Sequence, residues 1–288
     1  MDDERFTTLY ALVMDFAPRR GKRQQYSDAL ILLVFLGSVM RRKPRAWACD
    51  KRNAPRRLRD GPLPSPSQLS RRLRDPAFAI FWERFLTHSL ARQQQALCLL
   101  GCFLIDAKAL PVNRYTKDKQ AKRGWAGDRL AKGYKLFLLC DANARIVAWQ
   151  VHAMNQAEQT TALTLIQHSD RPGYVLGDSI YDTNDFYLAA AARGLQLIAP
   201  RKDPTANISD HASSPSRLHA IAMLETPNAS GFGLGLYARR TQIERVFSVM
   251  ASATVGLDSL PSWVRTLPRV RRWVEAMIVL FILFAPVI

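Results

Sequence analysis

The sequence has few cysteines, and they show no pattern typical of a zinc site or a disulfide scaffold. The four residues Cys49, Cys98, Cys102 and Cys140 form no CxxC pair and no regular framework. Zinc sites and disulfide-rich domains depend on paired or regularly spaced cysteines. The five histidines likewise show no ligand spacing such as HxxxH. We therefore expect reduced thiols in a cytoplasmic protein.

The sequence also lacks a hydrophobic run long enough to span a bilayer, which takes about 20 residues. Its two apolar runs, residues 29–40 and residues 276–288, are both shorter than this. The first ten residues, MDDERFTTLY, are acidic and contain no apolar segment like that of a signal peptide. We expect both runs to form buried core helices, and no membrane partner; the alternative is that they contact a membrane.

Acidic residues are scarce relative to basic ones. The 288 residues include 41 Lys or Arg against 24 Asp or Glu, which gives a formal net charge of +17. A charge of this size indicates the partner more than the fold. A polyanion is expected, either nucleic acid or an acidic membrane surface. Since 48% of the residues are hydrophobic, the chain can bury a core of one large domain or of two smaller ones.

The first 95 residues show helical patterns throughout. Ser27 is a plausible N-cap for the apolar helix that follows it. Residues 41–75 then contain twelve Lys or Arg against three Asp. This concentration of positive charge predicts contact with nucleic acid.

Within that basic segment, the turn-rich GPLPSPS leads into QLSRRLRD, a short helix that Ser65 or Ser67 would cap. The paired Arg71 and Arg72 would lie on the outer face of this helix. A short basic helix after a turn is typical of the second helix of a helix-turn-helix motif. The alternative is the solvated face of a helical bundle. We expect residues 1–95 to be an all-α DNA-binding region that uses Arg71 and Arg72.

From residue 96 onward the pattern changes to that of an α/β fold. The first three strands would form an antiparallel group, and the later ones would be parallel with crossover helices. We expect one domain over residues 96–288, with a short irregular insertion at about 202–235. The predicted strands are 98–110, 133–140, 144–154, 173–179 and 195–201, and the predicted helices are 156–169, 182–194 and 237–248.

Two aspartates end apolar strands. Asp106 ends LLGCFLID and Asp178 ends YVLGD. Charged groups at strand ends of an α/β sheet lie where ligands bind, although Asp also simply favours loops. If the first and fourth strands are neighbours, the two aspartates lie side by side, and the last helix would bring Glu244 to them.

Three clustered carboxylates repel one another unless cations bind between them. Oxygen ligands of this kind suit Mg²⁺ or Mn²⁺. Two such ions can hold both the attacking and the leaving oxygen of a phosphodiester. Asp106, Asp178 and Glu244 are therefore predicted as catalytic and metal-binding residues. Glu158 and Asp182 are further acids near the site.

Several basic residues near these acids are candidate DNA contacts. Tyr237 and Arg240 would lie on the same helical face as Glu244, at i, i+3 and i+7, where Arg240 suits a phosphate group. The alternative is a surface row of ion pairs. Lys108 lies on the same side of its strand as Asp106. Lys122 and Arg123 lie in a basic stretch around Trp125, which suits DNA binding or is a solvated loop.

These motifs resemble those of a known family. Asp106 in LIDAKAL, Asp178 in GDSIYD and Glu244 in YARRTQIER resemble the carboxylate triad of DDE transposases from bacterial insertion sequences. The best-known subgroup has Tyr, two residues, Arg, three residues, Glu, six residues and Lys. The sequence matches the first three positions, but Ala251 stands where that subgroup has Lys. Arg245 or the cluster Arg269–Arg272 would substitute for it.

The resemblance implies a ribonuclease-H-like core, a mixed sheet with flanking helices, and two Mg²⁺ ions per site, with Mn²⁺ possible. It also implies a homodimer on double-stranded DNA that binds the terminal inverted repeats, cuts the strand and joins it to target DNA. Such a protein would act in the bacterial cytoplasm at the nucleoid. Two alternatives stay open: a metal-dependent nuclease of the same fold, and a catalytically inactive DNA-binding protein.

Overall fold

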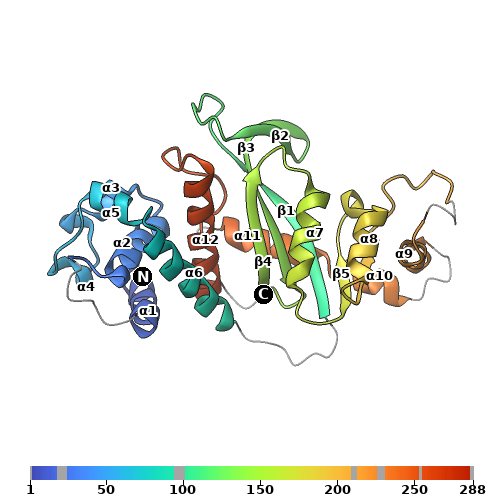
Figure 1. The fold of residues 1–288 in the computed structure, drawn as a ribbon, viewed down its shortest axis with the longest axis horizontal. Coiled ribbons are helices and arrows are strands. Elements are labelled where there is room, and N and C mark those ends of the chain that lie inside the picture. The colour runs from blue at the N-terminus through green and yellow to red at the C-terminus, as the bar shows by residue number, and fades with distance from the viewer. Residues whose placement is uncertain are drawn as a thin grey trace. The chain divides into compact units, whose positions relative to one another are not determined.

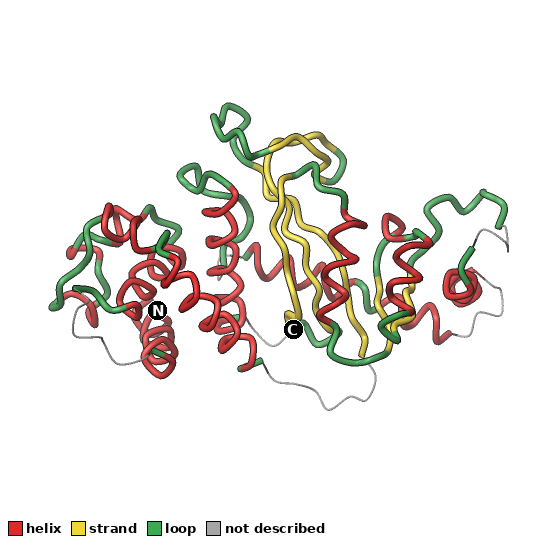
Figure 2. The backbone as a smooth tube through the Cα atoms, viewed as in Figure 1, coloured by secondary structure: helices red, strands yellow, loops and turns green. Residues whose placement is uncertain are grey.

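The computed structural model describes residues 2–17, 25–93, 101–208, 213–225, 231–252 and 255–285 (Figure 1, Figure 2). Its contacts divide the chain into two compact units. The helical unit comprises Met1–Gln93, Met250–Val264 and Arg272–Val287, and the sheet unit comprises Gln94–Val249 and Arg265–Arg271. The predicted domain boundary at 95/96 stays a prediction.

Every element in the described part of residues 1–93 is a helix. The side chain of Ser27 caps α2 by accepting a hydrogen bond from the Leu30 N–H, which confirms the predicted cap. Ser65 caps α5 in a reciprocal capping box with Gln68, so Ser65 rather than Ser67 is the cap. The helices are α1 (Asp2–Phe16), α2 (Asp28–Met40), α3 (Arg45–Ala48), η1 (Lys51–Asn53), α4 (Arg56–Arg59), α5 (Pro66–Arg72) and α6 (Pro76–Ala91).

The two apolar runs form core helices, as predicted, insofar as their residues are described. Residues 29–39 of α2 are buried almost without interruption. In α12 (Leu267–Phe284) the residues from Ala276 to Phe281 are buried. The Nε1–H of Trp82 in α6 donates a 2.7 Å hydrogen bond to Glu275 Oε2 in α12. Among the described residues, no helix has the length and hydropathy needed to cross a bilayer.

The sheet unit contains a mixed six-stranded sheet. Its order is β2-β3-β1-β5-β6, with β4 also paired to β3. β3 pairs antiparallel with β1, β2 and β4, whereas β5 pairs parallel with β1 and β6. The predicted adjacency of the first and fourth strands is thus confirmed. The strands are β1 (Gly101–Pro111), β2 (Lys122–Ala126), β3 (Arg129–Asp141), β4 (Ile146–Ala153), β5 (Gly173–Leu176) and β6 (Leu195–Ile198).

The sequence does not predict strand β2, whose residues belong to the basic stretch around Trp125 for which a solvated loop is the alternative to DNA binding. The strand reads KRGWA, and its Lys122, Arg123 and Trp125 side chains are exposed. It forms a hairpin with the start of β3 through a turn in which Gly127 has φ of 70°. Because none of its side chains is fully buried, the strand shows no apolar alternation by which a half-buried strand is recognised.

Helices cover both faces of this sheet (Figure 1). α7 (Glu158–Leu165) lies over β3 and β4, and α8 (Asn184–Ala191) packs on β6. α11 (Thr241–Ala251) lies on the opposite face from α7 (Figure 1), where its Phe247 contacts Lys108 of β1. Shorter 3-10 turns are η2 (Ile166–His168), which continues α7, and η3 (Ser179–Tyr181), which follows β5.

The predicted irregular insertion at 202–235 is wrong in part, because helices occupy much of it. They are α9 (Pro215–Glu225) and α10 (Gly231–Ala238). The three glycines of GFGLGLYA were interpreted as loop residues, but Gly233 lies at a close helix contact. A Cβ atom at Gly233 would stand 2.3 Å from the Met223 carbonyl oxygen. Close packing, rather than a turn, explains that glycine.

The single helix predicted over 237–248 is also wrong, because it is interrupted. α10 ends at Ala238, Arg239 and Arg240 form a turn, and α11 begins at Thr241. The turn is closed by the Arg240 N–H, which donates a 2.9 Å hydrogen bond to the Tyr237 carbonyl oxygen. Tyr237 and Glu244 therefore do not share one continuous helical face.

Candidate catalytic carboxylate site

Asp106 and Asp178 lie at neighbouring positions of the sheet. β1 and β5 pair in parallel up to Leu104 and Leu176. Asp106 and Asp178 each come two residues after this last pair, Asp106 within β1 and Asp178 beyond the end of β5. Asp106 Oδ1 accepts a 2.7 Å hydrogen bond from the Ala107 N–H. Asp178 caps η3 by accepting a 3.0 Å hydrogen bond from the Ile180 N–H. The two aspartates thus lie on adjacent segments of the chain, but the prediction that Asp106 ends its strand is wrong, because β1 stays paired with β3 as far as Pro111.

Arg240 lies among all three predicted carboxylates. Its Nη1–H donates a 3.0 Å hydrogen bond to Glu244 Oε1, and its Nη2 is 3.6 Å from Asp106 Oδ2. Burial alone would lower the pKa of Arg240, but the charges of Asp106, Tyr237, Asp178 and Glu244 raise it overall. Its Nε is buried and has no hydrogen-bond partner among the described residues. This guanidinium thus supplies positive charge to the site.

The environment of Asp106 makes its negative charge costly. Burial raises the pKa of Asp106 to about 6, and the nearby charges of Asp178 and Glu158 add to the increase. The Ala107 N–H bond and the Arg240 charge act in the opposite direction but only in part. A carboxylate in this situation gains from any additional cation placed beside it.

Tyr237 stays near the carboxylates although the helix is interrupted before Glu244. Burial raises the pKa of Tyr237, the charge of Arg240 lowers it, and the charges of Asp178, Glu244 and Asp106 raise it. Glu244 is the most open of the group, with 57% of its side chain exposed. The charges of Arg240, Asp178, Glu244 and Asp106 therefore all act on the Tyr237 phenol although a turn separates it from Glu244.

The carboxylate oxygens of this site are of the chemical type that binds a divalent cation, but their present arrangement does not form a metal site. Within the described ranges, no three His, Cys, Asp or Glu side chains are arranged to hold a metal ion. Carboxylate oxygens are the ligands that Mg²⁺ and Mn²⁺ prefer. Arg240 already stands as a cation beside Asp106 and Glu244. Metal ligation by all three carboxylates would require the guanidinium to move aside.

The two additional acids named from the sequence are both paired. Glu158 Oε1 accepts a 2.6 Å hydrogen bond from Lys135 Nζ, and its charge acts on Asp106. Asp182 is buried and accepts hydrogen bonds from Arg217 Nε and Nη2 and from the Lys202 N–H. Asp182 thus ties the loop after β6 to α9.

The other predicted DNA contacts in this unit lie at its surface or beside the site. Lys108 Nζ lies 5.9 Å from the centre of the Phe247 ring. Arg245 is exposed and makes only a 3.4 Å contact with Gln242. Lys122 and Arg123 project from β2, close in sequence to Trp125, which is 62% exposed. The four cations thus lie on the sheet unit, and β2, which the sequence did not predict, carries two of them.

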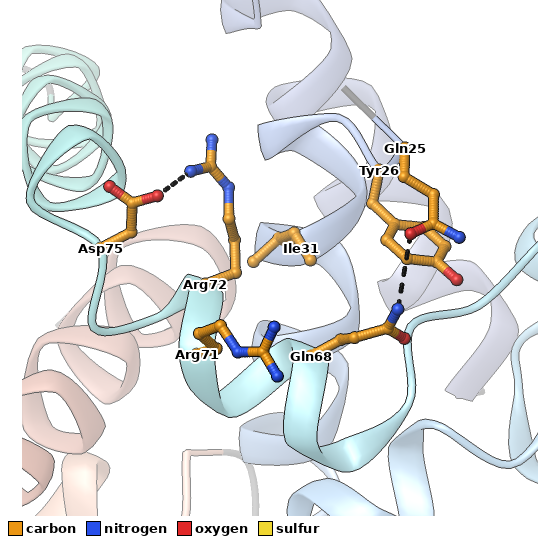
Figure 3. Close-up of a pocket in the computed structure, with 7 residues that line it drawn as sticks. All are labelled: Gln25, Tyr26, Ile31, Gln68, Arg71, Arg72 and Asp75. Atoms are coloured by element: carbon orange, nitrogen blue, oxygen red, sulfur yellow. Dashed lines mark hydrogen bonds and ion pairs between the residues drawn. The ribbon is translucent and has the colours of Figure 1, made fainter. Parts of the chain in front are cut away.

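Arg71 and Arg72 have different surroundings in the helical unit (Figure 3). Arg72 forms ion pairs with Asp28, at 2.7 Å, and with Asp75. Arg71 is exposed and forms no ion pair with a described residue. Both border a hollow of about 260 Å³, which is lined by Gln25, Tyr26, Ile31, Gln68, Arg71, Arg72 and Asp75. Of these two arginines, Arg71 is the one whose guanidinium is accessible to a phosphate group.

Tyr181 received no role from the sequence, although it lies within the motif GDSIYD. Its side chain is completely buried, and its hydroxyl has no hydrogen-bond partner among the described residues. Burial raises its pKa well above the ordinary value, and the charges of Asp106, Glu158 and Asp178 raise it further. The available signal was its position three residues after Asp178.

Comparison with known proteins adds one finding. Residues 98–281 match a family model described as "Transposase DDE domain". Searches of curated proteins and of solved structures found no significant match. The matched range contains Asp106, Asp178 and Glu244, and it covers more than half of the chain.

Proposed function

The chain belongs to the transposase DDE domain family, and we propose on that basis that it moves an insertion sequence by cutting and joining DNA. It would bind the terminal inverted repeats of its own element in the bacterial cytoplasm at the nucleoid. The observation that supports the proposal is the position of Arg240, which lies 3.6 Å from Asp106 Oδ2 and 3.0 Å from Glu244 Oε1. The order of the mixed sheet supports a ribonuclease-H-like core.

Asp106, Asp178 and Glu244 would hold two Mg²⁺ ions, with Mn²⁺ as a substitute. When bound, these ions stabilise the charge on the attacking and leaving oxygens of the phosphodiester. The carboxylates would hold the cations, whose positive charge would offset the repulsion among the three acids. Positioning and electrostatic stabilisation then supply most of the rate.

Arg240 and Tyr237 would contact DNA phosphates near the cleaved end. The Arg240 guanidinium suits a phosphate because it can donate two parallel hydrogen bonds. A phosphate beside Arg240 would draw it from Asp106 and Glu244 and so leave their oxygens free for the cations. Lys108 and Arg245 lie on the elements that carry these acids, β1 and α11, and would hold adjacent phosphates.

More distant contacts would come from the basic hairpin and the helical unit. Lys122 and Arg123 on β2 would hold the DNA backbone, and Arg71 with Arg72 would serve the all-α region predicted over 1–95. Arg72 would act mainly by holding α5 in place, since Asp28 and Asp75 already neutralise it. Because two ends must be processed together, the protein would work as a homodimer on DNA.

A Mg²⁺-dependent strand-transfer assay on the element's own end sequences tests this proposal. The expected result is joined product with the unaltered protein, and a loss of at least about 100-fold in Asp106→Asn, Asp178→Asn and Glu244→Gln. Cleavage without joining would indicate a nuclease of the same fold. If Asp178→Asn leaves every activity unchanged, the protein is a DNA-binding protein without this chemistry.

A further inference from the structure

The β2–β3 hairpin (Figure 1) presents an apolar pair of side chains to solvent. Trp125 of β2 stands directly opposite Leu130 of β3, next to the last pair of the hairpin, Ala126 and Arg129. Trp125 is 62% exposed and Leu130 is 64% exposed. Exposed apolar side chains that occur singly are common, but two that face each other across a hairpin form a small platform. This apolar pair is therefore a candidate contact surface.

The opposite face of the hairpin is packed, so the apolar pair points outward for a structural reason. Successive side chains of a strand point to opposite faces, and Gly124 therefore faces away from Trp125. A Cβ atom at Gly124 would lie 2.4 Å from the Met154 carbonyl oxygen. The Met154 N–H in turn donates a 3.0 Å hydrogen bond to the Gly133 carbonyl oxygen. Gly124 thus lets the hairpin lie against the chain that follows β4, and leaves the apolar pair on the open side.

Two cations lie beside the apolar pair on the same face. Arg123 stands directly opposite Lys132, two residues along each strand from the apolar pair. Like charges at directly opposite positions repel each other. Lys132 Nζ donates a 3.1 Å hydrogen bond to the Thr116 carbonyl oxygen, and neither cation forms an ion pair with a described residue. An anion held between Arg123 and Lys132 would remove this repulsion.

The chain around the hairpin carries an excess of the same charge. Residues 113–132 include seven Lys or Arg against two Asp. Of these two, Asp118 is buried and accepts hydrogen bonds from the Tyr134 hydroxyl and the Thr266 N–H, whereas Asp128 lies in the turn. An aromatic platform beside cations matches a nucleic-acid strand whose bases are unpaired, because a free base can stack on the ring and its phosphate is negative.

We propose that the outer face of the β2–β3 hairpin binds unpaired DNA. Trp125 would stack on one base with Leu130 beside it, and Arg123 and Lys132 would hold a neighbouring phosphate. The inference rests on the proposed function in that DNA is the partner, and it extends that function from paired DNA to a strand whose bases are open. A lipid surface fits less well, since the apolar pair is small and stable membrane contact needs a broader apolar face.

Binding of fluorescein-labelled DNA to the full-length chain, measured by fluorescence anisotropy in EDTA, tests the inference. The probes are a single-stranded oligonucleotide and the duplex of the same sequence. For Trp125→Ala we expect an affinity for the single strand about 5- to 100-fold lower, and an affinity for the duplex within twofold of the unaltered protein. Trp125→Phe should restore most of the single-strand affinity, because it keeps an aromatic ring.

Two control variants make the result specific. Leu188→Ala removes a side chain of α8 that is 56% exposed, and it should change neither affinity. Arg123→Gln removes a phosphate contact, so it should weaken the binding of both probes. It should also lower the slope of log affinity against log salt concentration by about 0.7–0.9.

Photocrosslinking provides a readout that does not depend on how a variant folds. A single strand that carries bromodeoxyuridine is bound to the unaltered protein and irradiated, and the crosslinked residue is identified by mass spectrometry. We expect the crosslink at Trp125, because a stacked base lies in contact with the ring. A crosslink that lies entirely outside residues 122–132 would overturn the inference.

The remaining outcomes separate this inference from the proposed function. Equal losses for single strand and duplex in Trp125→Ala would overturn it. The same holds if this variant loses sedimentation with phosphatidylglycerol vesicles while its single-strand affinity is unchanged. If Trp125→Ala behaves as expected but the unaltered protein joins no DNA ends in Mg²⁺, the proposed function fails and this inference stands. If the unaltered protein binds neither probe, both fail together.

Discussion

Among the single residues of the site, Arg240 supplies the positive charge that offsets the negative charges of the three carboxylates. It comes from the turn between α10 and α11, and it contacts Asp106 and Glu244 directly. A guanidinium and a divalent cation at one site compete, because each neutralises the same oxygens. The same residue that we expect to hold DNA would therefore also compete with a bound cation when DNA is absent.

Replacing this cation should strengthen metal binding. In Arg240→Gln without DNA, the affinity for Mn²⁺ should rise about tenfold, since even about one to two kcal/mol of charge competition corresponds to this change. A titration of the full-length variant with Mn²⁺ measures it. Arg239→Gln is the matched control, because Arg239 is exposed in the same turn and its replacement changes net charge equally. Equal affinities in the two variants would contradict the competition.

Among the secondary-structure elements, α10 contains glycines that favour an irregular segment in the sequence, and one of them, Gly233, is required by close packing of the helix. Composition alone favours a loop over 202–235, because glycine, proline and serine disfavour helices. In α10, however, Gly233 lies against the Met223 carbonyl oxygen of α9, whereas a Cβ atom at Gly235 would meet nothing within 4 Å. The two glycines look alike in sequence and differ only in what another helix places beside them.

This difference gives a paired stability prediction. Gly233→Ala should destabilise the protein by about 1–3 kcal/mol, because its Cβ atom would push α10 away from α9. Gly235→Ala should be neutral or stabilising by up to about 1 kcal/mol, since alanine is the better helix former. Urea unfolding of both variants provides the comparison. Similar losses in both would show that α10 does not pack on α9 in this way.

At the scale of the whole molecule, the helical unit is built from parts of the chain that are far apart in sequence. Its members include 1–93 and most of α12, and Trp82 of α6 donates to Glu275 of α12. A region predicted to end at residue 95 therefore shares its core with residues almost 200 positions later, since 193 positions separate Trp82 from Glu275. The strongly positive net charge of +17 belongs to the complete chain and suits a polyanionic partner.

A fragment of residues 1–95 should for this reason fold poorly by itself. Without α12, Trp82 of α6 loses its hydrogen bond to Glu275, and the helical unit loses the buried apolar residues of α12 from its core. Burial of apolar surface is the main source of stability. We expect circular dichroism to show reduced helicity and a broad thermal transition. Adding a peptide of residues 265–288 is the test of rescue. A sharp transition of the fragment alone, at the Tm of the full-length protein, would make residues 1–95 an independent domain.

Much of the site could be predicted because its signals are local. Asp106 lies within β1 and Asp178 follows β5 by two residues, but each comes directly after an apolar run, and such a run is recognised from neighbouring positions alone. The parallel pairing of those strands follows from the order of strands and helices along the chain. Glu244 was connected with the aspartates by the expectation that the last helix packs across the same edge of the sheet, and the family resemblance agreed with this.

Inspection of the chain alone was enough to predict the candidate carboxylates, the excess of positive charge and five of the six strands, because side-chain chemistry and short-range periodicity depend on individual residues and their neighbours. The folded arrangement was needed to place Arg240 among the carboxylates, to separate Tyr237 from Glu244 by a turn, and to bury the Tyr181 hydroxyl without a partner among the described residues. Each of these depends on how separate segments meet in space. Such contacts are set by packing, which minimises the free energy of the whole fold rather than of any one segment.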